Sequence, residues 1–582
     1  MIGAVVVDGD EEQTRFRVWA PRPRSIELEI VSPQAQRVPM RAVGDGYFEA
    51  TVAGVGAGAR YVYLLDGERR RPDPASRAQP EGVHGPSEVV DARAFPWKHA
   101  RRPRRMRDLI IYELHVGTFT REGTFDAAAG ALDRLVELGV TAVEILPVAS
   151  FSGARNWGYD GVSWFAPQRS YGGPDGLKRL IDACHARGLT FLLDVVYNHF
   201  GPEGNYVGEY APYFTSRVHT PWGDAIDYEG ERPVRDFVLD NARMWFDEYR
   251  VDGLRLDAVH AIFDGSPRHI VAEVAALGHA QDRVVIAESD LGDVAVISSP
   301  PAGWGCDAQW SDDFHHALHA VVTGEKSGYY EDFGAVGQLA VAVCEGFVYQ
   351  GQQSTFRKRP FGTPSRALSG ERFVVCAQNH DQIGNRAIGE RLAHLEPGCE
   401  HAVAATVLLA PAVPMLFMGE EHADPAPFQY FTDHQDAALA QAVRDGRRRE
   451  FPSWNASEVP DPQAQETRDR SVIDLALASG GRHADVRRWY RALVSLRREH
   501  PELVDKSRCA TVVDEPNGGF AMIHDGRLAV AVSLRGAATR LRLPGGPWRL
   551  ALDAGDFGGP TGGAVDAGTI SLPPWGALIL LA

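Results

Sequence analysis

Strand-like and helix-like segments alternate along the chain from residue 109 to about residue 503. Short apolar runs predict strands, and the segments between them carry apolar residues at helical spacing. Because each helix returns the chain to the same end of the sheet, this alternation predicts a parallel sheet covered by helices. About eight such units, with long insertions, fit a closed (β/α)8 TIM barrel better than an open sheet. The predicted strands include residues 109–119, 142–148, 190–199, 253–260, 284–289, 372–381 and 413–421, and the predicted helices include residues 125–138, 176–188, 233–250 and 484–500.

Two β domains are predicted on either side of this barrel, which occupies residues 109–503. Residues 1–95 form short alternating runs separated by turns and predict an N-terminal β-sandwich. Residues 504–582 return to the same pattern and predict a C-terminal β-sandwich. Residues 96–108 are rich in Lys and Arg and predict a basic linker, with an arm for nucleic acid or membrane as the alternative.

The charge of the chain restricts its partners. The 582 residues carry a formal net charge of -17, which argues against nucleic acid or an anionic membrane and leaves neutral ligands such as sugars open. The six cysteines are dispersed, without the spacing of a metal site or a disulfide framework. No apolar run reaches the ~18 residues of a membrane span, and the first residues lack the pattern of a signal peptide. We therefore expect a reduced, cytoplasmic protein.

Polar residues follow four of the predicted strands at the point where each strand ends. The carboxyl ends of barrel strands meet at one face, where the active sites of such barrels lie. We therefore expect these side chains to share one pocket. They are Asn198 and His199, then Arg255, Asp257 and His260, then Glu288, and finally His380 and Asp381.

Three carboxylates with an arginine, and no cluster of Cys or His, predict acid-base or covalent chemistry at a sugar acetal carbon. Arg255 and Asp257 are two residues apart and so point to the same side of a strand, where the arginine would hold Asp257 ionised as a nucleophile. The alternative is a purely structural ion pair. Glu288 has no cation beside it in sequence, so partial burial would favour the protonated form that a general acid needs. Asp381 would hold the sugar hydroxyls in the distorted transition state.

Four short segments give the chain its family resemblance. DVVYNH, GLRLDAVH, AES and NHD occur in order along the predicted barrel, and on these segments the chain resembles the α-amylase superfamily, glycoside hydrolase family 13. The resemblance implies that Asp257 is the nucleophile, Glu288 the proton donor and Asp381 the stabiliser of the transition state. It also implies a substrate-binding role for further residues, and no cofactor or metal is predicted. Those residues are Tyr159 of NWGYDG, which would stack on the sugar at subsite -1, with His199, Arg255, His260, His380, Gln382 and Asn385.

Other segments narrow the resemblance within the family. The N-terminal β-sandwich is similar to the carbohydrate-binding-module-like domain of branching, debranching and trehalose-releasing members. Segments such as WSDDFHHALH and AQNHDQIGNR are most similar to members that cut a maltodextrin from its terminal trehalose. This implies a retaining hydrolase of trehalose biosynthesis, with malto-oligosyl trehalose and maltodextrin as substrates and a malto-oligosyltrehalose synthase as its functionally coupled partner. The alternatives are a glycogen branching enzyme, another cytoplasmic α-glucan-acting member, and a non-catalytic glucan-binding protein.

The segment WSDDFHHALH is expected to line the side of the pocket that binds the leaving group. Asp313, His315 and His316 are the predicted substrate contacts there. The alternative is an ordinary polar helix start, with Asp312 or Asp313 as the N-terminal cap.

Overall fold

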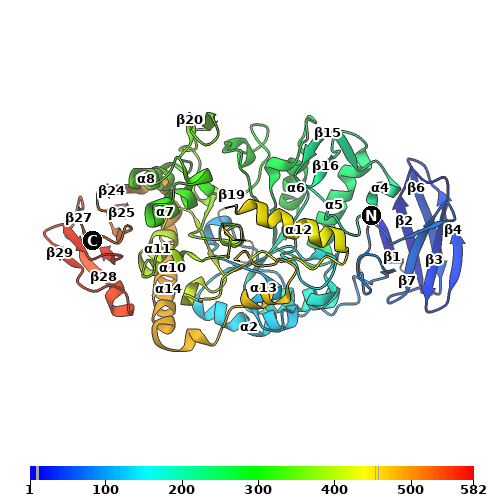
Figure 1. Cartoon of the computed structure of the whole chain (residues 1–582), viewed down its shortest axis with the longest axis horizontal. Coiled ribbons are helices and arrows are strands. Elements are labelled where there is room, and N and C mark those ends of the chain that lie inside the picture. The colour runs from blue at the N-terminus through cyan, green and yellow to red at the C-terminus, as the bar shows by residue number, and fades with distance from the viewer. Residues whose placement is uncertain (8–11, 453, 456–457) are drawn as a thin grey trace.

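The protein is an elongated molecule with a β domain at each end and a barrel between them (Figure 1). The structure is a computed structural model that describes residues 1–7, 12–452, 454–455 and 458–582. The fold class predicted from the sequence is confirmed, whereas the exact divisions of the chain at residues 95, 108 and 503 stay predictions.

Eight parallel strands close into the central barrel in chain order. Their side chains are buried except at Val284, because one face packs into the barrel interior and the other packs against helices. This double burial explains the continuous apolar runs of the sequence. The strands are β10 (Ile111–Leu114), β11 (Ala142–Ile145), β14 (Thr190–Val195), β17 (Gly253–Leu256), β18 (Val284–Ala287), β19 (Ala308–Trp310), β22 (Phe373–Val375) and β23 (Val413–Phe417).

Amphipathic helices surround the barrel, and their ends follow local capping rules. For example, the Thr124 hydroxyl accepts a hydrogen bond from the Ala127 amide where the first long helix begins, and Gly139 ends it at a φ of 95°. The long helices are α2 (Phe125–Leu138), α3 (Gly173–Ala186), α5 (Arg232–Asp247), α6 (Ile270–His279), α7 (Asp312–Thr323), α8 (Val336–Glu345), α11 (Glu400–Leu408), α12 (Ala437–Glu450) and α14 (Gly481–Glu499). Short helices are α1 (Val116–Phe119), α4 (Val207–Tyr210), α9 (His380–Gly384), α10 (Leu392–Leu395) and α13 (Gln465–Arg470).

The N-terminal domain is built from two β-sheets. Alternating residues such as Phe16 and Val18 are buried between them, as expected for a sandwich. One sheet has the order β1 (Gly3–Val7), β2 (Gln13–Trp19), β6 (Tyr47–Ala53), β5 (Arg41–Ala42). The other has the order β4 (Gln36–Pro39), β3 (Ile26–Ser32), β7 (Arg60–Leu65), β8 (Arg69–Arg71), with β9 (Ser87–Glu88) also paired to β7.

The C-terminal domain also contains two antiparallel sheets, and it packs against α8 and α11 of the barrel. The larger sheet has the order β24 (Cys509–Asp514), β25 (Gly519–His524), β26 (Leu528–Ser533), β31 (Ala577–Leu581), β28 (Arg549–Asp553). The smaller has the order β27 (Thr539–Arg542), β30 (Thr569–Leu572), β29 (Ala564–Asp566).

The basic segment of residues 96–108 runs along the barrel. Arg101 Nε lies 2.8 Å from Asp252 Oδ1, so this charge neutralises a buried barrel carboxylate. Within the described part of the chain, no helix is both long and apolar enough to cross a membrane.

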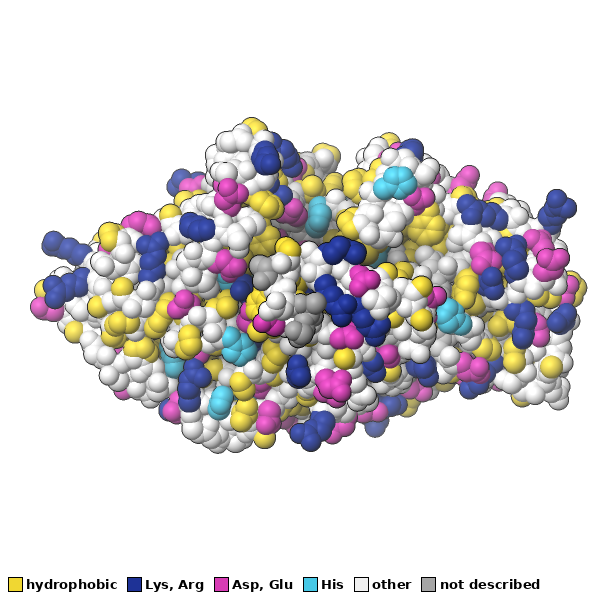
Figure 2. All heavy atoms as spheres, viewed as in Figure 1, with side chains coloured by type: hydrophobic (Ala, Val, Ile, Leu, Met, Phe, Trp, Pro, Cys, Tyr) yellow, Lys and Arg dark blue, Asp and Glu magenta, His cyan; other side chains and the backbone are white. Residues whose placement is uncertain are grey.

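Three hairpin insertions follow barrel strands on the carboxyl-terminal face: β12–β13 (Ala149–Ser150, Ser163–Pro167), β15–β16 (Phe214–Thr220, Gly223–Ile226) and β20–β21 (Gln350–Ser354, Arg359–Gly362). The last two form separate projections with a hollow between them (Figure 2). The strand ends that carry the predicted catalytic residues open on this same face of the barrel.

Candidate active site

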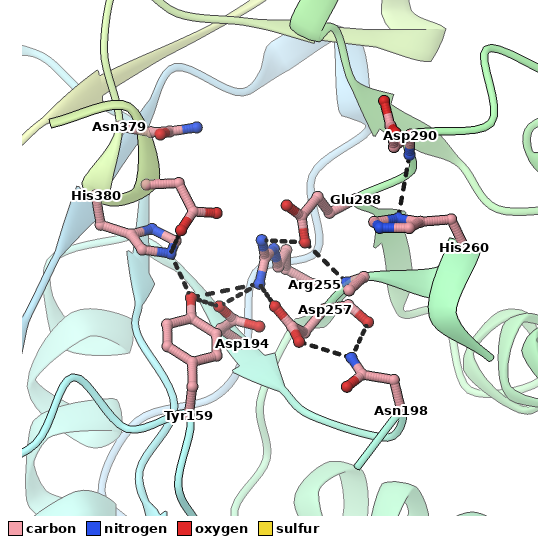
Figure 3. Close-up of polar contacts among 12 residues, drawn as sticks. Tyr159, Asp194, Asn198, Arg255, Asp257, His260, Glu288, Asp290, Asn379 and His380 are labelled. Carbon is pink, nitrogen blue, oxygen red and sulfur yellow. Dashed lines mark hydrogen bonds and ion pairs between the residues drawn. The ribbon is translucent and has the colours of Figure 1, made fainter. Parts of the chain in front are cut away.

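The guanidinium of Arg255 is the centre of the site (Figure 3). Its Nη1 lies 2.6 Å from Asp194 Oδ2 and 2.9 Å from Asp257 Oδ1, and its Nη2 lies 2.8 Å from Glu288 Oε2. The side chain is fully buried and stacks over Trp310 at 4.2 Å. Burial opposes the charge of Arg255, but the neighbouring carboxylates, led by Asp194 and Glu288, raise its pKa well above the usual range. Arg255 therefore stays a cation that holds three acids together.

Glu288 has no cation beside it in sequence, but it has one in space, because Arg255 contacts it across the sheet. Arg255 lies on β17 and Ile286 beside it on β18, so the guanidinium reaches the end of the neighbouring strand. Neighbours along the chain could not reveal a contact that the forked guanidinium makes between strands. Arg255 alone therefore does not distinguish Asp257 from Glu288.

The backbone turns sharply after Asp257. Ala258 has φ 39° and ψ 53°, a left-handed conformation that non-glycine residues seldom adopt. This turn aims the Ala258 amide at Glu288 Oε2, 2.8 Å away. On the other side, Asn198 Nδ2 donates to Asp257 Oδ2 at 2.7 Å. Each of the two acids thus has one neutral donor of its own besides the shared Arg255.

His380 and Asp381 are the first two residues of α9, and His380 faces the acids around Arg255 from the other side of the site (Figure 3). Asp381 Oδ1 lies 3.6 Å from His380 Nε2. Burial opposes protonation of His380, but the carboxylates of Asp381 and Glu113 raise its pKa to about 9. Its Nδ1 lies 2.5 Å from Glu113 Oε1. Burial, together with the charge of Glu288, raises the pKa of Asp381. His380 is thus a cation at neutral pH, fixed by Glu113 behind it.

Asp194 and Glu113 were not predicted as site residues, and the structure places both in the polar network. Burial raises the pKa of Asp194 to about 7, against the attraction of Arg255. The Tyr159 hydroxyl donates to Asp194 Oδ2 at 2.6 Å and lies 2.7 Å from His380 Nε2. The sequence did contain a sign of their role, because both acids lie within apolar strand segments, where a charged side chain is unusual.

His199 lies at the rim of the network. Its Nε2 pairs with the Tyr159 carbonyl at 2.9 Å, and burial lowers its pKa to about 4, so the ring is neutral. Trp222, in the turn of hairpin β15–β16, stacks on it with ring centroids 4.3 Å apart and is 49% exposed. Trp222 was not predicted from the sequence. His260 accepts from the Asp290 amide at 3.2 Å, on the Glu288 side.

The α7 residues lie farther along the same face. Asp313 and His316 line a cavity beside Asp290. The helix begins at Asp312 after Ser311, so neither aspartate is its cap. Asp313 instead accepts from the amides of Val348 (2.6 Å) and Tyr349 (2.9 Å).

The other predicted contacts are not among the residues that line this cavity. His315 is buried on α7, with its ring stacked on that of His319, and is not among the residues that line the cavity. Gln382 Oε1 accepts from Tyr330 at 3.4 Å, and Asn385 Nδ2 donates to Asp381 Oδ1 at 3.4 Å. The structure thus brings Asn385 to the acids and places Gln382 between the acids and α7.

Acids gathered around a buried arginine at the strand ends of a barrel fit an α-amylase-type glycoside hydrolase, and the comparisons with known proteins support this class. Two family models match the chain: "Alpha amylase, catalytic domain" over residues 103–218, and "Carbohydrate-binding module 48 (Isoamylase N-terminal domain)" over residues 2–80. A crystal structure described as a putative alpha amylase from Salmonella typhimurium is 38% identical with a TM-score of 0.91, covering 100% of this chain and 99% of that one. A pullulanase from Bacillus acidopullulyticus shares only the fold, at 19% identity and a TM-score of 0.75, covering 100% of this chain and 75% of that one.

Relatives similar over nearly the whole chain carry one name. The malto-oligosyltrehalose trehalohydrolase of Saccharolobus solfataricus is 44% identical over 90% of this chain and 91% of its own length. The enzyme of that name from Rhizobium sp. is 44% identical over 93% of this chain and 94% of its own length. The one from Mycobacterium tuberculosis is 41% identical over 91% of this chain and 94% of its own length. The chain belongs to the malto-oligosyltrehalose trehalohydrolase family of the α-amylase superfamily.

Proposed function

We propose that this chain cuts the α-1,4 bond between a maltodextrin and its terminal trehalose and releases both products. The observation that carries the reaction type is the single guanidinium of Arg255 in contact with both Asp257 and Glu288. One guanidinium can bridge two carboxylates only when they lie close together, and a separation of about 5 to 5.5 Å is typical of retaining glycosidases. The substrate follows from the name that relatives at 41–44% identity share.

Asp257 is assigned as the nucleophile and Glu288 as the acid-base residue. The Asp257 carboxylate attacks C1 of the sugar at subsite -1 and forms a β-glycosyl-enzyme, while Glu288 gives its proton to the oxygen of the departing trehalose. Glu288 then takes a proton from the water that attacks C1. Two inversions at C1 leave the released maltodextrin in the α configuration.

The remaining polar groups are assigned to the sugar at subsite -1. The cationic His380 faces the reacting acids, and Asp381 lies beside it, so both are assigned to bind hydroxyls and favour the distorted ring of the transition state. The Tyr159 ring lies beside them and serves as the stacking surface. His199 and Arg255 complete this wall, and His260 borders it on the Glu288 side.

Trehalose is assigned to the surface beside Asp290, over the small cavity there. His316 lies in its wall, and the exposed Tyr329 ring stacks on His316 with centroids 4.7 Å apart. Asp313 shapes the wall by holding the Val348 and Tyr349 amides. A pocket whose polar groups pair with trehalose hydroxyls leaves those groups unpaired when maltose occupies it, which discriminates strongly. His315, Gln382 and Asn385, which the sequence predicts as substrate-binding residues, are not among the residues that line this cavity, and their role stays a prediction.

Paired kinetics on two substrates test the proposal. We expect kcat/KM for a malto-oligosyl trehalose to exceed that for a linear malto-oligosaccharide of equal length by at least about a hundredfold, or roughly 2.7 kcal/mol. His316→Ala should reduce this ratio more than it lowers activity on the linear sugar. Free trehalose is the product to quantify. Comparable rates on both substrates, or glucose and maltose without trehalose, would contradict the proposal.

A branching enzyme is the other outcome that the experiment must separate. The 1,4-alpha-glucan branching enzyme of Xanthomonas euvesicatoria is 33% identical, but only over 44% of this chain and 39% of its own length. Formation of α-1,6 branches on amylose, without trehalose release, would favour that activity. We place the enzyme in the cytoplasm, where a malto-oligosyltrehalose synthase would supply its substrate.

A further inference from the structure

Two of the six cysteines differ from the others in exposure and position. Cys184, Cys306, Cys376 and Cys399 are buried, whereas Cys344 and Cys509 are only partly buried. Cys344 lies near the end of α8 in the barrel, and Cys509 is the first residue of β24 in the C-terminal domain. The two partly buried cysteines therefore lie on neighbouring elements at the boundary between two domains, where α8 and β24 lie side by side (Figure 1).

The contact between these residues is direct. Cys344 Sγ lies 3.6 Å from the Cys509 carbonyl oxygen and 3.9 Å from Thr511 Oγ1. The neighbouring Cys509, aided by Thr511, lowers the pKa of Cys344 to about 7, and the same neighbourhood raises the pKa of Cys509. Cys344 is thus the thiol that ionises, and a thiolate is the reactive form of cysteine.

The surroundings hold α8 against β24 at both ends. Glu515, just after β24, accepts from the Val336 and Gly337 amides at 3.0 Å each, where α8 begins. Lys506, just before β24, donates to the Glu345 carbonyl at 3.1 Å, where α8 ends. These bonds keep α8 docked beside β24, so Cys344 and Cys509 stay neighbours without any movement of the domains.

We propose that Cys344 and Cys509 form a redox-sensitive thiol pair that low-molecular-weight disulfides convert into a covalent link between the barrel and the C-terminal domain. The Cys344 thiolate attacks one sulfur of glutathione disulfide, a mixed disulfide forms, and one glutathione thiolate leaves. Cys509 then loses its proton and attacks Cys344 Sγ, and the second glutathione leaves as the Cys344–Cys509 bond forms. The protein loses two electrons and two protons, and glutathione disulfide is reduced to two thiols.

The link has a defined consequence for stability. It joins residues 165 positions apart in the chain, and closing such a long loop restricts the unfolded state more than closing a short one. We expect the oxidised protein to keep its activity within about twofold, since neither cysteine belongs to the proposed catalytic network. The effect should appear in the calorimetric transition of the C-terminal domain, as a rise of about 2–5 °C.

Treatment of the full-length reduced protein with glutathione disulfide tests the pair. The expected results are a loss of two of the six titratable thiols, a peptide that joins residues 344 and 509, a higher transition temperature, and reversal of all three by dithiothreitol. Cys344→Ser and Cys509→Ser should each abolish the linked peptide and the temperature rise. The matched control Cys184→Ala removes a buried cysteine on α3 and should leave both effects intact.

Three results would overturn the proposal. The first is that all six thiols remain titratable after treatment. The second is a glutathione adduct on Cys344 that persists while no linked peptide forms. The third is a linked peptide that forms without a change in the transition temperature. If a serine variant fails to fold, thiol counting and peptide mapping of the wild-type protein still decide the question.

Discussion

At the scale of single residues, the two proposed catalytic acids differ in their neutral hydrogen-bond donors and not in their pairing with a cation. Arg255 contacts both, so the distinction depends on what each acid touches besides: the Asn198 amide for Asp257 and the Ala258 amide for Glu288. We expect Asp257→Asn to lower kcat by at least about a thousandfold, or roughly 4 kcal/mol, on every substrate, because no other group attacks C1. Glu288→Gln should slow the natural substrate far more than a glycosyl fluoride, whose leaving group needs little protonation. Equal losses on both substrates would contradict the assignment of Glu288 as the acid. If Asp257→Asn kept a tenth of wild-type turnover, the assignment of Asp257 as the nucleophile would be wrong.

His380 provides a prediction about pH at the same scale. Its pKa in the folded protein, about 9, exceeds the ~6.5 of an unfolded histidine, so its stabilising contribution is full below pH ~6.5 and is lost as pH rises through about 9. The difference of about 2.5 pKa units corresponds to about 3 kcal/mol. We expect the unfolding free energies of wild type and His380→Gln to differ by about 3 kcal/mol more at pH 6 than at pH 10. Denaturant titrations at both pH values measure this, and a constant difference would contradict it.

At the scale of elements, hairpin β15–β16 extends the proposed site beyond the barrel. Trp222 in its turn is 49% exposed and stacks on His199, a position suited to stacking on a bound sugar. We expect Trp222→Ala to lower kcat/KM about tenfold, or roughly 1.4 kcal/mol, mainly through KM. Leu550→Ala is the control, since Leu550 is similarly exposed on β28 in the C-terminal domain. Unchanged kinetics in Trp222→Ala would show that the hairpin takes no part in binding.

The helices and strands also show how much of the fold and of the site could be predicted from the sequence. Seven of the eight barrel strands were predictable because burial on both faces requires continuous apolar runs, and the strand-end grouping of Arg255, Asp257 and Asp381 followed from that topology. The eighth, β19, is only three residues long, and no range was predicted for it. Hairpins such as β20–β21 were not predicted, because their largely polar and exposed residues carry no clear alternation. Contacts between elements could not be predicted either, because a pair such as Arg255–Glu288 depends on which strands are neighbours in space.

At the scale of the whole molecule, an ion pair between a buried arginine and a partly buried glutamate joins the N-terminal domain to the barrel. Arg77 is 3% exposed, lies 3.3 Å from Glu248 Oε1 and packs over the Phe165 ring at 4.9 Å. Arg77→Met should destabilise the protein by about 3–5 kcal/mol, because Glu248 is left partly buried without its partner. The exposed Arg70, paired with Glu29 within the N-terminal domain, is the control, and Arg70→Met should cost less than ~1 kcal/mol. Calorimetry compares the two variants, and equal shifts would mean that the Arg77 pair is not a significant tie between the domains.

The left-handed turn at Ala258 has a consequence for how this site could change under selection or engineering. Any residue that replaces Ala258 must adopt a positive φ and must have a backbone N–H to donate to Glu288. Proline is therefore excluded, and β-branched residues would strain the turn. Glycine, asparagine and aspartate can adopt this conformation at low cost. In a library randomised at codon 258, active clones should therefore be enriched in these residues and alanine. Backbone shape, and not side-chain chemistry, would then set the mutational tolerance of the position next to the proposed nucleophile.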